Sequence, residues 1–305
     1  MAVFSTGDLK NLPRQIADGM VKDVVTGSTV AALSGREPMR FGDVDIVTFN
    51  DLPRAEFVDE GAEKSPTTSG FGVVTAAPKK AQVTLRFNEE VKWADEDYQL
   101  QVLSEVASAG KTALARALDL GVYHRINPLT GQPISGWTNY LDATTLRVDE
   151  SDNPDLDIEA AAGLVIGAQK AVNGIALDPT YAWKIATARY SDGRKKFPEL
   201  GLGINVSSFE AIPASVGNTV SGLPEADEDT GVRGIVGDFN GGIRWGVQRE
   251  IPVRVFDVGD PDGQGDLARM NQIAIRLEIL YAWYAFTDRF AVIEEPGEDE
   301  PPVEG

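Results

Sequence analysis

The side chains with the greatest capacity for chemistry are carboxylates. The 305 residues include 47 Asp and Glu, a single histidine and no cysteine. The lack of cysteine excludes disulfides, thiolate metal sites and cysteine nucleophiles. His124 is a possible general base, but no second histidine and no serine in a nucleophile-elbow context accompanies it, which favours a packing or surface role. Paired carboxylates are abundant, so a carboxylate-dependent hydrolase stays open as an alternative, although no spacing selects one pair.

Several acidic or glycine-rich loops resemble ligand-binding motifs superficially. Residues 227–231 (DEDTG) and 257–266 (DVGDPDGQGD) look like calcium loops, and the second carries Asp257, Asp260, Asp262 and Asp266. Their spacing fits no EF-hand, and no closing glutamate follows. Residues 201–205 (GLGIN) and 237–242 (GDFNGG) match no dinucleotide or phosphate-loop motif. We therefore predict turns and solvated loops, and we predict no catalytic residue, cofactor or metal.

The charge of the chain limits its partners. A net charge of −19 repels free nucleic acid on average. The one tight basic cluster, Arg194, Lys195 and Lys196, is interpreted as a solvated loop, with nucleic acid or a neighbour's acidic surface as alternatives. The N-terminus lacks the apolar run of a signal peptide, and no apolar stretch of about 18 residues occurs. Synthesis in the cytosol without a membrane partner is expected.

The elements that would position these groups include a long arm. Residues 1–43 contain short apolar groups broken by glycine and proline, and residues 44–49 (VDIVTF) read as a strand. Val83, Leu85 and Phe87 alternate with polar residues and predict a second strand. The residues between have few bulky apolar side chains and a flexible tip at 64–70. The two strands predict a hairpin reaching roughly 45 Å. Because an isolated hairpin is marginal in water, its partner must be the body or another copy.

A long helix is predicted from Asp95 to about Tyr123. Its apolar positions recur every three or four residues and include Leu103, Val106, Leu114 and Leu118. Roughly 28 residues at 1.5 Å each give about 40 Å, which suits a spine.

The second half of the chain predicts a mixture of helices and strands. A second helix is expected over 157–173 with Gly174 as its C-cap, and a third begins with Asp178 as N-cap and Pro179 in its first turn. Short strands are expected within 204–215 and 233–239, a strand pair within 243–258, and a strand from Ile273. Residues 294–305 predict an acidic disordered tail.

The order of these parts resembles the tailed-bacteriophage major capsid protein family, whose Hong Kong 97-type fold encapsulins share. Five segments carry the resemblance. They are 55–68 (AEFVDEGAEKSPTT), 79–97 (KKAQVTLRFNEEVKWADED), 187–200 (TARYSDGRKKFPEL), 234–257 (GIVGDFNGGIRWGVQREIPVRVFD) and 271–293 (NQIAIRLEILYAWYAFTDRFAVI). In the family these correspond to the start of the extension loop, the strand leading into the spine helix, an axial-domain loop, a strand–turn–strand, and the closing strand pair of the peripheral domain.

The resemblance implies an α+β fold with a specific division of the chain. The expected parts are an N-terminal arm (1–43), a strand leading into the loop (44–54), a β-hairpin extension loop (55–92), a peripheral domain with the spine helix (93–140), an axial α/β domain (141–255), a return to the peripheral domain (256–293) and the tail (294–305).

It also implies a structural function rather than an enzymatic one. Copies are expected to assemble through pentamers and hexamers into an icosahedral virion shell around double-stranded phage DNA, in the host cytoplasm. An encapsulin-like compartment holding a cargo enzyme is the alternative. The extension loop is expected to contact neighbouring subunits through Glu60, Gly61, Lys64, Pro66, Gly70, Phe71, Lys79 and Lys80.

Other partners follow from the same resemblance. A separate scaffolding protein is expected, because residue 44 is already in a strand and no long scaffolding region precedes it. A portal is also expected, and a decoration protein is a further candidate partner. The N-terminal arm would make sparse contacts with DNA, without sequence specificity, through Lys10, Arg14 and Lys22.

Overall fold

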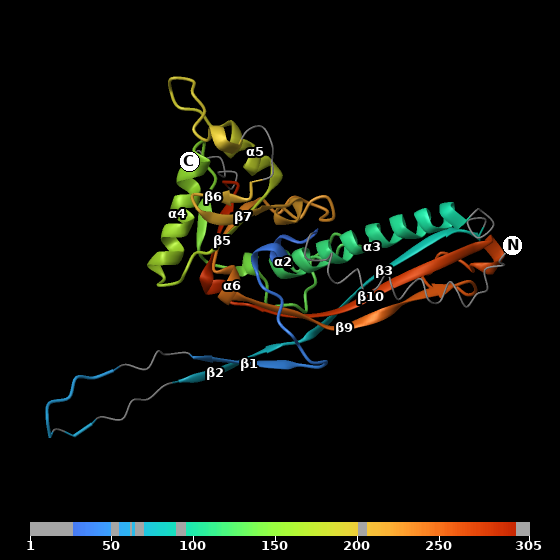
Figure 1. Cartoon of the computed structure of the whole chain (residues 1–305), viewed down its shortest axis with the longest axis horizontal. Coiled ribbons are helices and arrows are strands. Elements are labelled where there is room, and N and C mark those ends of the chain that lie inside the picture. Colours follow the sequence, from blue (N-terminus) through green and yellow to red (C-terminus); the bar gives the residue numbers. More distant parts are fainter. Residues whose placement is uncertain are drawn as a thin grey trace, which may run out of the picture.

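The computed structural model describes residues 27–49, 55–61, 63, 64, 70–89, 96–200 and 206–296. The predictions for Lys10, Arg14, Lys22, Pro66, residues 201–205 and most of the tail lie outside these residues. Within the described chain the strands form a two-stranded arm, a three-stranded sheet and a six-stranded sheet (Figure 1).

A long helix packs against the three-stranded sheet, and the two form adjacent layers. Helix α3 (Glu96–His124) lies along β3 (Pro78–Asn88), β10 (Gln272–Ala285) and β9 (Ile243–Phe256), which pair in the order β3-β10-β9 (Figure 1). Gly110 and Gly121 bring α3 close to the sheet, since an added Cβ would lie 2.0 Å from Leu277 and 2.7 Å from Trp283. The predicted spine helix is thereby confirmed as a helix within one residue at each end.

The buried face of α3 agrees with the predicted apolar pattern where its side chains are described. Leu114 and Leu118 are buried in the core cluster that includes Leu277 and Tyr281 of β10. The side chains of Leu103 and Val106 lie outside the described part of the helix.

The six-stranded sheet lies between two apolar layers. Its strands follow the order β4-β11-β8-β5-β7-β6. They are β4 (Arg147–Asp149), β5 (Gly174–Leu177), β6 (Ser208–Phe209), β7 (Ile212–Val216), β8 (Val232–Gly237) and β11 (Phe290–Glu294). Successive side chains along each strand point to opposite faces of the sheet. On one face Ile175 and Val236 pack with α4 (Pro154–Gly167) and α5 (Pro179–Thr187). On the other face Ala176 and Ile235 belong to the core that includes α3.

Short helices connect these layers. They are α2 (Thr29–Leu33), α6 (Phe239–Gly242), η2 (Leu141–Ala143), η3 (Pro198–Leu200), η4 (Asn218–Val220), η5 (Ala268–Met270) and η6 (Thr287–Arg289).

The arm differs from the prediction in its second strand. β1 (Val44–Phe49) pairs antiparallel with β2 (Phe71–Ala76), whereas Val83, Leu85 and Phe87 lie in β3 and pair with β10. These three residues form the predicted half-buried strand, but the buried side of that strand packs on the body. Lys79 and Lys80, which were assigned to the extension loop, therefore lie in the sheet of the body.

Two predicted element boundaries are wrong. The helix expected over 157–173 is α4, which starts and ends earlier, and Gly174 begins β5 instead of capping the helix. Because Gly174 has no side chain, Phe239 packs directly against it, and an added Cβ would lie 2.6 Å from the Phe239 Cδ2. The strand pair expected within 243–258 is one strand, β9, with two register shifts against β10. The N-cap at Asp178 is confirmed, because its side chain accepts a hydrogen bond from the Thr180 N–H at 2.8 Å.

The sheets also divide the chain differently from the predicted domains. The expected boundary at 255 lies inside β9, which pairs with β10 in the three-stranded sheet. β11 was expected in the returning segment beside β10, yet it lies between β4 and β8 in the six-stranded sheet. The tail was expected to begin at 294, but Glu294 ends β11 and the Glu295 N–H donates to the Gly231 carbonyl oxygen at 2.8 Å.

The packing of α3 on β10 generates a stability prediction. Leu114→Ala should lower the free energy of unfolding by about 2–5 kcal/mol, through lost transfer energy and the cavity left behind. Denaturant unfolding of the subunit measures it, with the exposed Leu129→Ala as control. An unchanged midpoint for Leu114→Ala would mean that this face of α3 is not packed as described.

Candidate assembly surface

The arm exposes apolar side chains. Val47 and Val73 lie opposite each other on one face and are 61% and 61% exposed, and Phe71 is 62% exposed. The described residues at the far end of the arm, 55–61, 63 and 64, are also exposed. Figure 1 shows the arm extending away from both larger sheets. The predicted contact residues Glu60, Gly61, Lys64, Gly70 and Phe71 all lie on this arm.

The N-terminal root of the arm is attached to β9. The Glu37 N–H donates to the Trp245 carbonyl oxygen at 2.9 Å, and the Gln248 Nε2 donates to the Gly42 carbonyl oxygen at 2.6 Å. Close approach requires Gly246, where an added Cβ would lie 2.3 Å from the Glu37 carbonyl oxygen. The other root is β3, which pairs with β10 from Pro78 to Asn88. The two strands of the arm therefore arise from opposite edges of the three-stranded sheet.

A lysine and two tryptophans lie at the second root. The Lys79 Nζ is 4.2 Å from the ring centroid of Trp283 and 5.4 Å from that of Trp137, and the two rings meet edge to face. Burial removes water from the Lys79 ammonium and lowers its pKa to about 8. Lys80 forms an ion pair with Glu278 at 2.7 Å. In the single chain both lysines thus contact their own subunit.

A buried carboxylate attaches the segment that precedes the arm. Asp119 of α3 accepts hydrogen bonds from the N–H groups of Thr29 at 2.8 Å and Val30 at 3.1 Å, from the Thr219 hydroxyl at 2.8 Å, and from Ser28. Burial raises the pKa of Asp119, although the hydrogen bonds from these donors act to lower it. The sequence prediction missed this residue. The available signal was an acidic side chain inside the apolar run 117–123.

The other side chains that could take part in chemistry form contacts within the chain. His124 is buried, with its Nε2 2.8 Å from the Val220 carbonyl oxygen, so it has a packing role. Arg86 pairs with Asp262 and lies 3.0 Å from Asp260, and this arginine lowers the pKa of Asp262. Among the described residues no group of three or more His, Asp and Glu side chains is placed to hold a metal ion.

The predicted basic cluster is divided by its contacts. Lys196 pairs with Asp155 of α4 at 3.0 Å, while Arg194 pairs with Asp192 at 2.6 Å inside the same loop. Arg189 donates to the Gly193 carbonyl oxygen at 2.8 Å. The loop that follows α5 extends outward from the six-stranded sheet (Figure 1).

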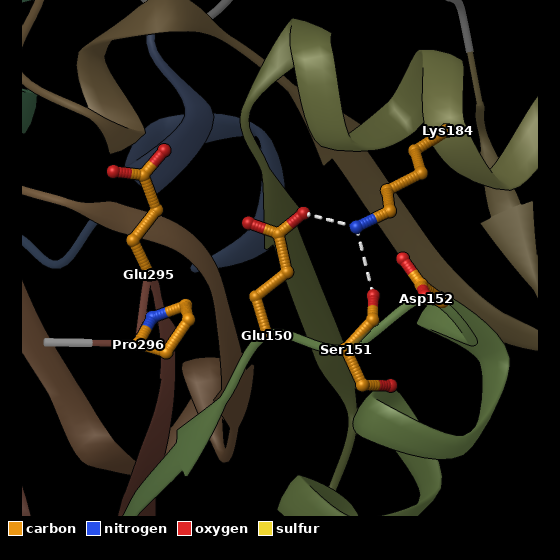
Figure 2. Close-up of a pocket in the computed structure, with 6 residues that line it drawn as sticks. All are labelled: Glu150, Ser151, Asp152, Lys184, Glu295 and Pro296. Atoms are coloured by element: carbon orange, nitrogen blue, oxygen red, sulfur yellow. Dashed lines mark hydrogen bonds and ion pairs between the residues drawn. The ribbon is translucent and has the colours of Figure 1, made fainter. Parts of the chain in front are cut away.

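An open hollow beside β4 and α5 is lined by polar side chains, which Figure 2 shows. The Lys184 Nζ is 2.7 Å from a Glu150 carboxylate oxygen and 2.8 Å from the Ser151 carbonyl oxygen. The Ser151 hydroxyl is 2.6 Å from Asp157. The lining residues are Glu150, Ser151, Asp152, Lys184, Glu295 and Pro296. Because these six include no histidine and the lysine is paired, they do not form a nucleophile with its base.

Comparisons with known proteins identify the fold. No protein-family profile and no curated protein matches the chain. A solved structure from Mycobacterium phage Ogopogo is 44% identical with a TM-score of 0.79, covering 88% of this chain and 92% of that chain. One from Gordonia phage Cozz is 29% identical with a TM-score of 0.75, covering 89% and 87%. The capsid of an empty GTA particle is 12% identical with a TM-score of 0.59, covering 88% and 90%.

The mixed helix and sheet architecture is therefore that of phage capsid structures. The chain belongs to the family of tailed-bacteriophage major capsid proteins, and its function is to form the icosahedral shell of the virion. The comparisons favour neither the encapsulin nor the hydrolase alternative. No helix in the described parts of the chain is long and apolar enough to cross a membrane.

The root of the arm generates a pH prediction. The pKa of Lys79 is lower in the folded chain, about 8, than its ordinary 10.5. Between these pH values the unfolded chain binds more protons, so this group makes folding stability rise with pH. Lys79→Met should remove that rise, and at pH 7 it should be at least as stable as the wild type.

Denaturant unfolding from pH 7 to 10 measures both effects, with the exposed arm residue Lys64→Met as the control for loss of a lysine. A clear loss of stability of Lys79→Met at pH 7 would show that attraction to the tryptophan rings outweighs desolvation.

Proposed function

We propose that each arm lies across a neighbouring copy, and that the copies form pentamers and hexamers of the shell. The observation that carries this proposal is the exposed apolar face of β1 and β2 on an arm whose two roots are fixed. A two-stranded hairpin is marginal in water by itself. Contact with a second subunit would remove Val47, Phe71 and Val73 from water and stabilise the arm.

The shell would enclose double-stranded phage DNA without sequence-specific contacts. The net charge of −19 supports this proposal, because an acidic or neutral inner wall lets DNA slide during packaging, whereas a basic wall would retain it. The N-terminal residues Lys10, Arg14 and Lys22 would supply the sparse basic contacts. Assembly in the host cytoplasm with a separate scaffolding protein, a portal and a possible decoration protein completes the proposal.

The arm can be tested with one substitution. Val47→Asp should leave the subunit folded, because the side chain is exposed, but lower the yield of particles about tenfold or more by placing a charge in the contact. Electron microscopy and sedimentation of expressed particles measure the yield, and circular dichroism checks the fold. Leu129→Asp, an exposed leucine of the body, is the control. Normal particles from Val47→Asp would show that this face of the arm is not covered.

The charge of the chain predicts how salt affects assembly. Each copy repeats an acidic surface, and repulsion between copies weakens as the Debye length falls from about 30 Å at 0.01 M to about 10 Å at 0.1 M. Apolar contacts are not weakened over this range, so assembly of purified subunits should increase. Light scattering across the range measures it. A steady decrease would mean that attractive ion pairs dominate the contacts between subunits.

A further inference from the structure

The outer face of α4 is apolar although it faces solvent. Leu156, Leu164 and Ile166 are 54%, 39% and 62% exposed. The small residues Ala160, Gly163 and Gly167 lie among them on exposed positions. An added Cβ at either glycine would meet nothing within 4 Å, so shallow depressions lie between the larger side chains. The opposite face of α4 already packs on the six-stranded sheet.

A second exposed apolar surface follows on the next helix. Trp183 of α5 and Tyr190 of the loop after it are both exposed, while Tyr181 and Ile185 form the buried face of α5. Aromatic side chains of this size are typical anchors of contacts between proteins. The two surfaces differ in shape: one has depressions over glycine, and the other has large protruding rings.

Their charges are complementary. Asp152 and Glu159 are exposed at and near the start of α4, and neither forms an ion pair within the described chain. The loop after α5 carries Arg189 and Arg194. Arg194 is partly neutralised by Asp192, but the described contact of Arg189 is with a backbone carbonyl oxygen, so its charge is not compensated there. An acidic edge thus accompanies the depressions, and a basic edge accompanies the rings.

We propose that the outer face of α4 docks on Trp183, Tyr190 and the basic loop of a second copy. This inference rests on the proposed assembly into rings. A ring of identical subunits needs a head-to-tail contact, in which each copy offers two different and complementary surfaces. The α4 face and the α5 surface meet that requirement because they differ in their side chains and carry opposite charge. Two α4 faces meeting each other would instead place Glu159 and its symmetry mate in one contact without a basic partner.

Cross-linking tests the pairing directly, because the chain has no cysteine of its own. Gly163→Cys and Tyr190→Cys subunits are co-assembled under reducing conditions, and the particles are treated with a short bifunctional maleimide. Cross-linked dimers are expected in mixed particles and not in particles of either variant alone. Dimers from Gly163→Cys alone would show that α4 meets α4. Intact mixed particles without dimers would also overturn the pairing. Failure of the wild type to form particles would instead count against the proposed assembly.

A second variant covers the case in which the cysteine subunits do not assemble. Gly163→Leu fills the depression without a clash in the subunit, so its unfolding midpoint should not fall, while particle yield should drop about tenfold or more. Ser108→Leu, the corresponding change at an exposed position of α3, should assemble normally. Normal assembly of Gly163→Leu, or equal loss in both variants, overturns the proposal.

Discussion

The close contact between α3 and β10 is the interaction on which the other parts of the subunit depend. Side chains are absent at Gly110 and Gly121, so Leu277 and Trp283 pack directly against the helix. The resulting core continues through Leu118 to the inner face of the six-stranded sheet. One apolar core therefore joins both sheets, and the arm and the outer helices are attached to a body whose parts have fixed positions.

The attachments to this body are of two physical kinds. The arm roots and α2 are held by directional polar contacts, of which the buried Asp119 carboxylate is the most concentrated, with donors from residues 28–30 and from Thr219. The arm itself and the outer face of α4 are exposed and apolar. Polar contacts thus fix the position of the arm roots and of α2, whereas the arm and the outer face of α4 leave apolar side chains exposed to solvent.

Much of the fold was accessible from the sequence because its signals are local. The periodicity of α3, the alternation from Ile273 and the cap at Asp178 each depend on neighbouring residues, and each prediction was confirmed. Pairing between distant strands has no such signal. The partner of β1 is β2, whose six residues include two small ones and lack a strong pattern. The clear alternation of β3 wrongly predicts it as that partner, because nothing local shows that β10 lies beside it.

The exposed arm was partly predictable from the sequence, whereas the contacts at its roots were not. The composition of residues 60–82 predicts an arm with little to bury, and the described residues at its far end and one face of β1 and β2 are exposed, whereas residues 78–82 lie in β3 and pair with β10. The packing of Lys79 against Trp137 and Trp283 was not predictable, since these residues come from three separate parts of the chain. Two of the carboxylates that suggested a calcium loop, Asp260 and Asp262, are instead bound by Arg86, which lies 174 and 176 residues away in the sequence, a contact that only the tertiary structure creates.

The segment that leads into the arm has another consequence. Residues 36–42 run beside β9, with hydrogen bonds at Trp245 and Gln248, and Pro38 in this segment has no N–H to offer. An open strand edge recruits further strands and leads to fibrous aggregation. In the first half of β9, at Trp245 and Gln248, that edge is occupied by the chain's own segment. Strand addition from another copy is therefore blocked at this part of β9, which leaves side-chain surfaces for the contacts that close the shell.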